Sequence, residues 1–464
     1  MKLSVVIPTY NMASLLREGL SYLAAQQLVP GLEFEVIVID DGSADDTRGV
    51  VEAFTGRLPS LSYHFLPRGP RSCRAAARNR GIEVAQGELL TFLDSGLALS
   101  PRFLSAVSQQ LSQAPRRMLI HPVYGLVARY GTKYGSDVSA LASLTPESFD
   151  AACEQLRRLP EWDDPREGYF QLCGDRLEQL KAPWMLGWTT AVSLPRALAR
   201  EAGGFDADFL GWGMEDIDFS YRLHLGGASF AVAREAPVVH LPHPPLSSTA
   251  DKQRSHDANV LRMHRKHRTR ETEVCLLFSG PHLNHALARL DDLVIQGVGP
   301  RYAVDMLQAL AASHLAGPGP SLAVGVDGFA EACHLPVTHM LAPHHTLRAR
   351  LAEQFPERTV ECLLGIDTPF PDGFFEVAVV TDFLRMFPEA TARRMARELV
   401  RIARKVVLLC TPGAEMYLSQ DGQPWASLEA LESSLQAEGL RWEELLVQGD
   451  HTLIALSSLQ EHAP

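Results

Sequence analysis

The chain has 464 residues, of which 46% are hydrophobic and 21% are charged, and its formal net charge is −12. These values are typical of an ordinary globular protein with two or three domains, and the negative charge argues against non-specific nucleic-acid binding. Seven scattered cysteines form no Cys-x-x-Cys pair, which argues against a zinc or disulfide framework.

The N-terminal residues run directly into an apolar strand pattern, without the charged and long apolar segments of a secretion signal. Nowhere do 18 apolar residues follow one another, so no membrane-spanning helix is expected. We therefore expect a cytoplasmic protein, and peripheral contact with a membrane stays open.

The first 110 residues alternate between strand and helix patterns. Strands are predicted at 3–10, 34–43, 61–67 and 89–95, and helices at 12–26, 44–54 and 71–86. This alternation predicts a parallel sheet covered by helices. Such sheets bind ligands at the carboxyl ends of their strands, which is where Asp40, Asp41 and Asp94 stand.

Residues 115–185 are less regular and rich in prolines and charges, as a loop-rich acceptor region would be. A further strand is predicted at 228–233, followed by the histidine-containing segment VVHLPHP. Residues 251–272 are strongly basic and predict one helix. That helix could be a solvated closing element, or it could reach a phosphate.

A second alternating pattern begins near residue 274 and predicts another doubly wound α/β domain. Its strands are predicted at 321–326, 337–341, 359–364, 375–380 and 405–410, and its helices at 281–296, 302–314, 345–354, 389–404 and 426–438. Two last strands, 442–448 and 451–457, are joined by a short turn and predict an antiparallel hairpin.

Polar residues at the strand ends of the first pattern could hold a nucleotide. The carboxylates of Asp40 and Asp41 can accept hydrogen bonds from a base or a ribose. Arg78 and Asn79 could orient a sugar nucleotide or offset its phosphate charge. Asp94, with Mg²⁺ or Mn²⁺, could bridge a diphosphate. Each aspartate alone would also fit a turn or a helix cap.

In order and spacing, these residues resemble the family-2 glycosyltransferases with the GT-A fold. The matching stretches are 5–11, 36–47, 78–95 and 203–223. The resemblance implies a nucleotide-sugar-binding domain over residues 1–270 and inverting transfer of a sugar, from a UDP-linked donor, to an acceptor. On this resemblance Thr9 lies by the nucleotide, Asp41 binds the base or ribose, and Asp94 is the first acid of the Asp-x-Asp motif.

The stretch GWGMED at 211–216 resembles the acceptor-side motif of the same family, with Gly211 and Trp212 flanking the sugar. A single-displacement transfer needs a carboxylate that takes the proton of the attacking hydroxyl. We expect Asp216, rather than Glu215, to be this base, with its pKa lowered by the helix N-terminus. Alternatively, the two acids could simply cap that helix.

The sequence departs from the family at Gly96, where the second acid of Asp-x-Asp would stand. Nitrogen ligands from His240 or His243 are acceptable to Mn²⁺ and could replace that acid. A water, or a metal-free site that relies on arginine, could serve instead. The missing acid also leaves open a non-catalytic scaffold that binds a sugar nucleotide.

Residues 365–412 and the final hairpin resemble class I S-adenosylmethionine-dependent methyltransferases, which gives a second domain over 271–464. The cofactor motifs are poor, because Ala323 stands where an acid is implied and 337–345 offers no carboxylate. We therefore expect a non-catalytic domain that does not bind S-adenosylmethionine, and a bifunctional enzyme is the alternative. The sequence does not identify the acceptor (glycan, lipid, peptide or small molecule) and leaves a homo-oligomer open.

Overall fold

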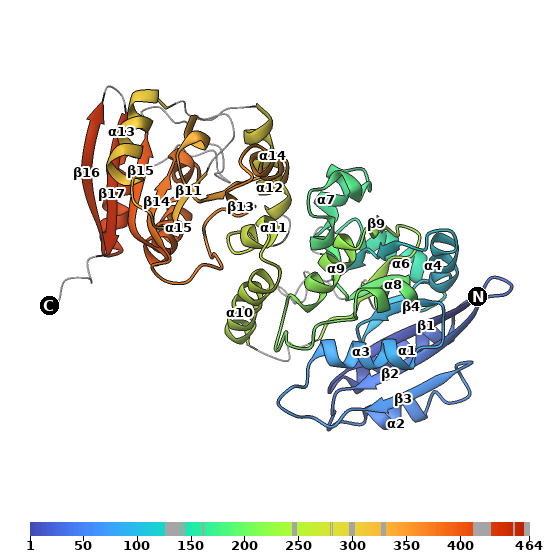
Figure 1. Ribbon diagram of the computed structural model, residues 1–464. Helices are drawn as coiled ribbons and strands as arrows, with labels where there is room; N and C mark the ends of the chain where they lie inside the picture. The colour runs from blue at the N-terminus through green and yellow to red at the C-terminus, as the bar shows by residue number, and fades with distance from the viewer. Residues whose placement is uncertain are drawn as a thin grey trace. The chain divides into compact units, whose positions relative to one another are not determined.

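The structure is a computed structural model, and it describes most of the chain. The described residues are 1–125, 141, 144–159, 162–243, 248–278, 280, 282–296, 302–325, 331–411, 428–448 and 451–458. The chain divides into two compact units, Met1–Met263 and His264–Pro464 (Figure 1). The domain boundary expected near residue 270 stays a prediction.

The first unit is built on a seven-stranded sheet with the order β3-β2-β1-β4-β8-β6-β9. Its strands are β1 (Lys2–Thr9), β2 (Glu33–Asp40), β3 (Leu61–Phe65), β4 (Leu89–Leu93), β6 (Arg117–Ile120), β8 (Ala191–Pro195) and β9 (Ser229–Val232). The first four are parallel to one another, as predicted. The mostly apolar sequences of β1, β2 and β4 suit strands that are covered on both faces, whereas the edge strand β3 is only partly buried.

Helices cover this sheet and place polar residues at its carboxyl edge. They include α1 (Ala13–Ala24), α2 (Thr47–Glu52), α3 (Arg74–Val84), α4 (Phe103–Leu111), α8 (Arg196–Glu201) and α9 (Glu215–Leu225). In the irregular region, the described residues include the short helices α6 (Phe149–Leu156), α7 (Glu167–Leu172), η3 (Leu177–Gln179) and η4 (Pro183–Leu186). Helix α1 buries Leu16, Leu20 and Leu23 in the core, which fits its amphipathic spacing.

A small second sheet with the order β5-β10-β7 lies at the end of β4. It consists of β5 (Leu97–Leu99), β7 (Val123–Tyr124) and β10 (Val238–His240). Strand β10 runs antiparallel to β5, with His240 opposite Leu97, and the Leu241 amide donates to the Gly96 carbonyl at 3.0 Å. This pairing brings the late histidine segment beside the strand end that carries Asp94.

The basic segment 251–272 is helical as predicted, but it forms two helices rather than one, α10 (Thr249–His267) and α11 (Arg270–Val274). The break lies at Arg268, whose φ of 51° is left-handed. Thr269 then starts α11 with a capping box, in which its side chain accepts from the Thr272 amide. The helical pattern of the segment is therefore interrupted at Arg268, because Thr269 caps the start of a second helix.

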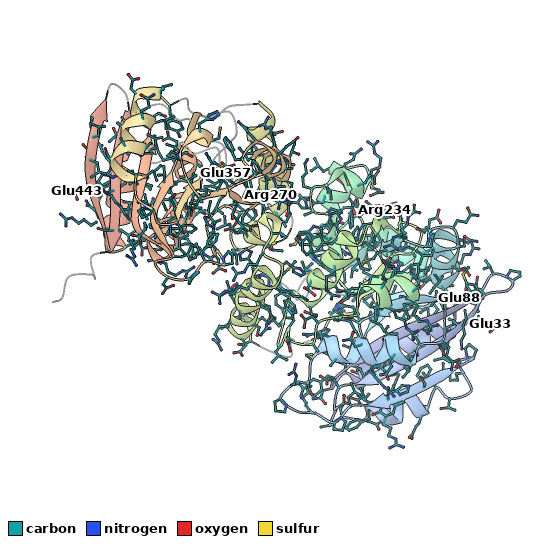
Figure 2. The ribbon with its side chains drawn as sticks, in the orientation of Figure 1. Glu33, Glu88, Arg234, Arg270, Glu357 and Glu443 are labelled. Atoms are coloured by element: carbon teal, nitrogen blue, oxygen red, sulfur yellow. The ribbon has the colours of Figure 1, made fainter. Side chains whose placement is uncertain are left out.

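The second unit contains a sheet with the order β13-β12-β11-β14-β15-β17-β16. Its strands are β11 (Ser321–Val324), β12 (His339–Leu341), β13 (Thr359–Glu361), β14 (Phe375–Val380), β15 (Ala403–Cys410), β16 (Leu440–Gln448) and β17 (His451–Ser458). The first five pair in parallel, and the predicted antiparallel hairpin is confirmed. Glu443, labelled in Figure 2, lies on the edge strand β16, where exposed charges discourage pairing with another sheet.

Besides α11, the described helices of the second unit are α12 (His282–Gln296), α13 (Val304–His314), α14 (His345–Gln354), α15 (Glu389–Ile402) and α16 (Leu428–Ala437), with η5 (Glu331–His334) and η6 (Asp382–Met386). The unit is therefore a mixed α/β structure with mostly parallel strands. Among the described helices of the whole chain, none is long and apolar enough to cross a membrane.

Candidate active site

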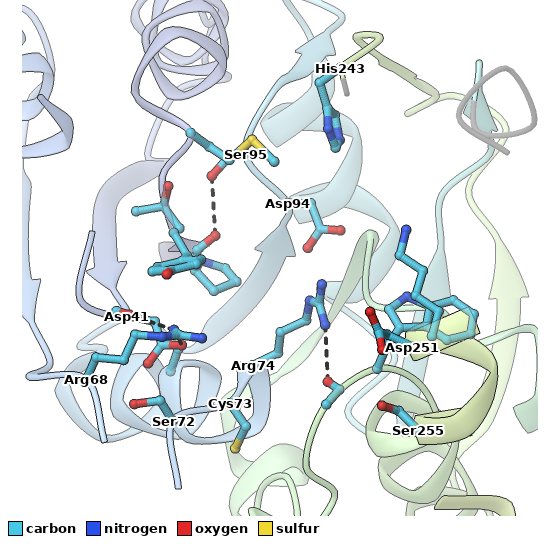
Figure 3. Close-up of a pocket in the computed structure, with 18 of the residues that line it drawn as sticks. Asp41, Arg68, Ser72, Cys73, Arg74, Asp94, Ser95, His243, Asp251 and Ser255 are labelled. Atoms are coloured by element: carbon cyan, nitrogen blue, oxygen red, sulfur yellow. Dashed lines mark hydrogen bonds and ion pairs between the residues drawn. The ribbon is translucent and has the colours of Figure 1, made fainter. Parts of the chain in front are cut away.

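The carboxyl ends of β1, β2 and β4 border one cavity of about 310 Å³ (Figure 3). Thr9, Asp41 and Asp94 line it from these strand ends, as expected for ligand residues of a parallel sheet. Other segments complete the wall: Arg68 and Arg74, the loop residues Gly211 and Trp212, the histidines His240 and His243, and Asp251, Lys252 and Ser255 of α10. Residues far apart in the sequence thus converge on one site.

Asp41 lies in the part of the cavity that is bordered by Tyr10. The Arg68 guanidinium binds the Asp41 carboxylate at 2.8 Å and lies over the Tyr10 ring, 3.8 Å from its centroid. Burial raises the pKa of Asp41, and the nearby Arg68 opposes this shift only in part. The Thr9 hydroxyl is buried and has no hydrogen-bond partner among the described residues. A ligand here could therefore use the Thr9 hydroxyl and the Asp41 carboxylate.

Asp40 does not line the cavity, although it was expected to bind the donor. Its side chain is 1% exposed, and it accepts hydrogen bonds from the Tyr63 hydroxyl at 2.6 Å and the Ser43 amide at 2.7 Å. These contacts use both carboxylate oxygens to fix the turn after β2. Asp40 thus supports the position of its neighbour Asp41.

Asn79 likewise lies away from the cavity. Its side-chain amide donates to the Phe205 carbonyl and accepts from the Phe205 amide, both at 2.7 Å. This pair of bonds ties α3 to the segment that precedes GWGMED. The contacts of Asn79 in the structure are with protein backbone.

Arg78 is buried behind the cavity wall and joins two of the expected functional acids. Its guanidinium lies 3.3 Å from the Asp94 carboxylate and 3.1 Å from the Glu215 carboxylate. Burial opposes its charge, but Asp94, Glu215 and Asp216 together raise the pKa of Arg78, so it stays protonated. In this position Arg78 orients the acids, and Arg74 is the arginine of α3 that reaches the cavity.

The GWGMED segment is a tight turn that leads into α9, whose first two residues are Glu215 and Asp216. Three of its residues have left-handed backbones, with φ of 77° at Gly211, 94° at Gly213 and 74° at Met214. Such a conformation is uncommon for a non-glycine residue and occurs often at functional sites. Met214 occupies the N-cap position without a side-chain cap bond, and the Asp216 carboxylate accepts from the Ile217 amide in the first turn of α9 at 2.9 Å.

Asp216 has a raised pKa, contrary to the lowered one expected from the helix N-terminus. Burial and the neighbouring Glu215 raise the pKa of Asp216 to about 7, although Arg78 and the amides of Ile217 and Thr189 favour the charged form. The loss of water around the carboxyl therefore outweighs the helix dipole and the nearby cation. A carboxyl that titrates near neutral pH is well suited to proton transfer.

Asp94, His240 and His243 share the cavity wall, so the expected metal ligands are neighbours. Figure 3 shows the Asp94 carboxylate between His243 and Arg74. Within the described ranges, however, no three His, Cys, Asp or Glu side chains form a group that could hold a metal ion. The side chains of Asp94, His240 and His243 would therefore not complete the coordination shell of a divalent ion by themselves.

The sequence did not single out Arg68, Arg74 or Lys252, which bring positive charge to the cavity. Arg74 begins α3 and donates to the Gly211 carbonyl at 3.4 Å. A spacing of four residues places Arg74 and Arg78 on one face of α3. This spacing could have pointed to Arg74 as a second arginine near the site, but it does not tell which of the two arginines is buried.

A sequence profile described as Glycosyl transferase family 2 matches residues 4–131. A validoxylamine A glucosyltransferase of Streptomyces hygroscopicus subsp. limoneus is 31% identical over 423 residues, which cover 87% of this chain and 89% of the relative. The chain belongs to glycosyltransferase family 2. This glycosyltransferase thus has the sugar-transfer activity that its sequence motifs indicated.

Two other comparisons differ in how much of the glycosyltransferase they cover. Chondroitin synthase of Escherichia coli is 27% identical over 255 residues, covering 54% of this chain and 36% of the relative. Residues 1–349 of S. aureus TarS, solved in complex with UDP, align with a TM-score of 0.38 at 19% identity, covering 67% of this chain and 79% of that one. The 423-residue match extends beyond the first unit, which ends at Met263, whereas 255 residues would fit within it.

Proposed function

We propose that the protein transfers a hexose from a UDP-linked donor to an acceptor hydroxyl, with inversion, and that Asp216 is the base. The observation that carries the proposal is the cavity at the carboxyl edge of the first sheet. Asp41, Asp94 and Trp212 line that cavity, and Asp216 follows Trp212 by four residues, at the start of α9. Asp216 is not itself in the lining, but it interacts electrostatically with Arg78, which binds Asp94 of the cavity wall.

The donor would lie along the strand ends. The Asp41 carboxylate would accept hydrogen bonds from the base or the ribose. The Thr9 hydroxyl could donate a hydrogen bond to them or accept one. The Arg74 guanidinium and the Lys252 ammonium line the same cavity and would offset the diphosphate charge. Arg78, held between Asp94 and Glu215, would keep Asp94 oriented toward the donor.

The proposed chemical step is a single displacement. The acceptor oxygen attacks the anomeric carbon while the bond from that carbon to the diphosphate breaks, and Asp216 takes the proton of the hydroxyl. Because its pKa is near 7, Asp216 is substantially ionised at neutral pH and yet basic enough to accept a proton. The Glu215 carboxylate is bound to Arg78 and is therefore the weaker candidate.

Asp94 is the residue that we propose as ligand for a divalent ion, Mg²⁺ or Mn²⁺, with His243 or His240 as a second ligand. Both histidines line the cavity beside Asp94, and oxygens of the diphosphate and water would complete the shell. When bound, the ion would supply positive charge to the leaving diphosphate. The competing arrangement has no metal and relies on Arg74 and Lys252.

The acceptor that we propose is a small polyhydroxylated molecule rather than a growing polysaccharide. The glucosyltransferases that act on validoxylamine A match 87% of the chain, including part of the second unit. Chondroitin synthase of E. coli matches 54%. Resemblance over both units favours the small acceptor, and the word glucosyltransferase in the name of the relative favours glucose as the sugar.

A screen of nucleotide sugars tests the proposal. Purified protein is incubated with UDP-glucose, UDP-N-acetylglucosamine, GDP-mannose and other donors, with Mn²⁺ or with chelator, and the released nucleoside diphosphate and the thermal midpoint are measured. We expect a UDP-sugar to be hydrolysed slowly, transferred on addition of a polyol acceptor, and stabilising. If no donor is turned over and none raises the thermal midpoint, the proposed activity is wrong. The alternative hypothesis, a non-catalytic scaffold that binds sugar nucleotides, is then wrong as well.

For the second unit we propose a methyltransferase-like fold that does not use S-adenosylmethionine. Support comes from the parallel strands followed by the antiparallel hairpin. Support also comes from the side chains of the protein itself, which form hydrogen bonds at the carboxyl ends of these strands. After β13, the Glu273 side chain of α11 accepts bonds from four consecutive backbone amides, 364–367.

The strand end after β14 is occupied in a similar way. Asp382 accepts bonds from Arg385 at 2.7 Å and from the Thr411 amide at 2.8 Å, and its own amide donates to the Tyr302 hydroxyl at 2.8 Å. These polar groups satisfy one another where a cofactor would need partners. Residues 326–330, which follow β11 in the sequence, lie outside the described residues.

Calorimetry of the full chain with S-adenosylmethionine distinguishes the two readings of this unit. We expect no heat of binding. Saturable binding, followed by methylation of the glycosylated product, would establish the bifunctional enzyme instead.

A further inference from the structure

The turn that carries Trp212 and leads to Asp216 is held from outside by one face of α10. Ser255, His256 and Asn259 are spaced by three and four residues, so they share a face of this helix. Ser255 also lines the cavity, and the His256 ring lies 5.7 Å from the Trp212 ring, centroid to centroid. The face therefore contacts the turn at several points.

Asn259 makes the polar connection between α10 and the turn. Its side-chain nitrogen donates to the Leu210 carbonyl at 3.0 Å and to the Gly213 carbonyl at 2.9 Å. These two carbonyls bracket Gly211 and Trp212. Asn259 is 5% exposed, so water cannot readily replace these bonds.

The turn needs such support because its backbone is unusual. Met214 is a non-glycine residue with a φ of 74°, a conformation that costs about 1–3 kcal/mol unless the surroundings enforce it. The Gly213 carbonyl belongs to the peptide that enters Met214, so its bond to Asn259 acts directly on this conformation. Met214 is also the N-cap residue of α9, the helix on which Asp216 is the second residue.

The helix face also leaves little room for other residues in the turn. A Cβ on Gly211 would lie 2.5 Å from the Ser255 hydroxyl oxygen, and a Cβ on Gly213 would lie 3.0 Å from the His256 Nδ1. Close backbone packing and the two Asn259 bonds thus fix the turn together. An amide is suited to this place because its NH₂ group offers both donors that the two carbonyls require.

We propose that Asn259 is a positioning residue for sugar transfer, which holds the 210–214 turn and so fixes Trp212, which lines the cavity, relative to Asp216 at the start of α9. The proposal rests on the function proposed above, in which Asp216 is the base. Asn259 is not among the residues that line the cavity, and it would act through the backbone of the turn. Its loss should therefore impair the transfer step more than donor binding.

The test uses the full chain with Asn259→Asp, Asn259→Leu and the matched control Gln253→Glu. Asn259→Asp turns two donors into acceptors that face carbonyl oxygens, and Asn259→Leu removes the bonds without adding a charge. Gln253 is exposed on the same helix, where its side-chain amide donates to the Asp257 carboxylate at 2.7 Å. Gln253→Glu therefore makes the same amide-to-carboxylate change on α10, away from the turn.

Two measurements are made on each variant: steady-state kinetics with the donor found in the screen, and amide hydrogen exchange of peptides that cover 210–216. Both Asn259 variants are expected to exchange faster in these peptides. Their kcat should fall by about 10- to 100-fold, the cost of a catalytic group that is about 1 Å out of place, while the donor KM stays within about twofold of that of Gln253→Glu.

Unchanged exchange over 210–216 in both Asn259 variants overturns the proposal, whatever the rates are. A kcat equal to that of Gln253→Glu, with faster exchange, overturns it as well, because the turn would then move without consequence. If the wild-type protein turns over no donor, the proposed function fails, and hydrogen exchange alone decides whether Asn259 holds the turn.

Discussion

A Cβ atom on Gly96 would lie 2.9 Å from the Cβ of Leu15, against helix α1. Gly96 has a φ of 84°, so an L-residue there would be strained as well as crowded. The position that matches the second acid of Asp-x-Asp is therefore shaped for glycine, and a side chain there would be directed at Leu15.

The first prediction is that Gly96→Asp destabilises the protein without improving metal binding. Gly56→Asp is the matched control, because Gly56 has a φ of 82° and no atom within 4 Å of an added Cβ. Overpacking should make Gly96→Asp less stable than Gly56→Asp by about 1–3 kcal/mol, as measured by urea unfolding. Tighter Mn²⁺ binding by Gly96→Asp in titration calorimetry would show that residue 96 can serve as a ligand after all.

The second prediction concerns the buried arginine between the two acids. Arg78→Met leaves the Asp94 and Glu215 carboxylates without their shared cation, and the Glu215 side chain is only 8% exposed. Removing one partner of a buried ion pair typically costs about 3–5 kcal/mol. We expect a loss of this size in urea unfolding, together with loss of transfer.

The control for this prediction is Arg80→Met, on the same helix. Arg80 is partly exposed, and its ion pair with Glu83 is at the surface, so its removal should change stability by less than about 1 kcal/mol. Equal stabilities of Arg78→Met and Arg80→Met would mean that Arg78 does not hold the acids.

The third prediction is the pH dependence of transfer. Asp216 accepts a proton only when it is ionised, and its pKa is raised to about 7. Activity should therefore be low at pH 5–6, rise as pH increases through about 7, and level off above it. The measurement is kcat/KM against pH with saturating metal.

Asp216→Asn should abolish transfer at every pH and leave UDP-sugar binding, followed by calorimetry, nearly unchanged. Glu215→Gln should keep the rising limb of the profile, because Glu215 is occupied by Arg78. If Glu215→Gln removes this limb and Asp216→Asn retains it, the roles of the two acids are reversed.

The sequence predicted the architecture well where local pattern and burial agree. Apolar runs of five to eight residues form β1, β2, β3 and β4 with the parallel pairing expected. It was less informative where neighbouring residues differ in direction or depth. Asp40 and Asp41 are adjacent, yet Asp40 is the last residue of β2 and is buried, while Asp41 follows the strand and is the one of the two that lines the cavity.

Other features depend on contacts between distant segments. The choice between Arg74 and Arg78 is made by packing around α3, and the raised pKa of Asp216 comes from burial, which no local pattern reports. The role of Asn259 depends on α10 packing against a turn 46 residues earlier in the chain. Spacing within one element could not have revealed these relationships.

The fourth prediction decides how the diphosphate charge is neutralised. With a bound metal, excess chelator should abolish transfer and Mn²⁺ should restore it, and Asp94→Asn should remove the Mn²⁺-dependent rise in thermal midpoint measured with UDP present. His243→Ala should weaken this rise if His243 is the second ligand, since both residues line the cavity. Arg71→Ala is a surface control for arginine loss, because Arg71 is exposed and pairs with Asp208.

Without a metal, transfer would survive chelator, and positive side chains would carry the whole charge of the leaving group. Arg74→Ala should then raise the donor KM and lower kcat far more than Arg71→Ala does, because only Arg74 of the two lines the cavity. In the metal-dependent case Arg74→Ala should have the smaller effect, since the ion shares the neutralisation. The comparison of chelator with Arg74→Ala therefore shows which positive charge compensates for the absence of an acid at Gly96.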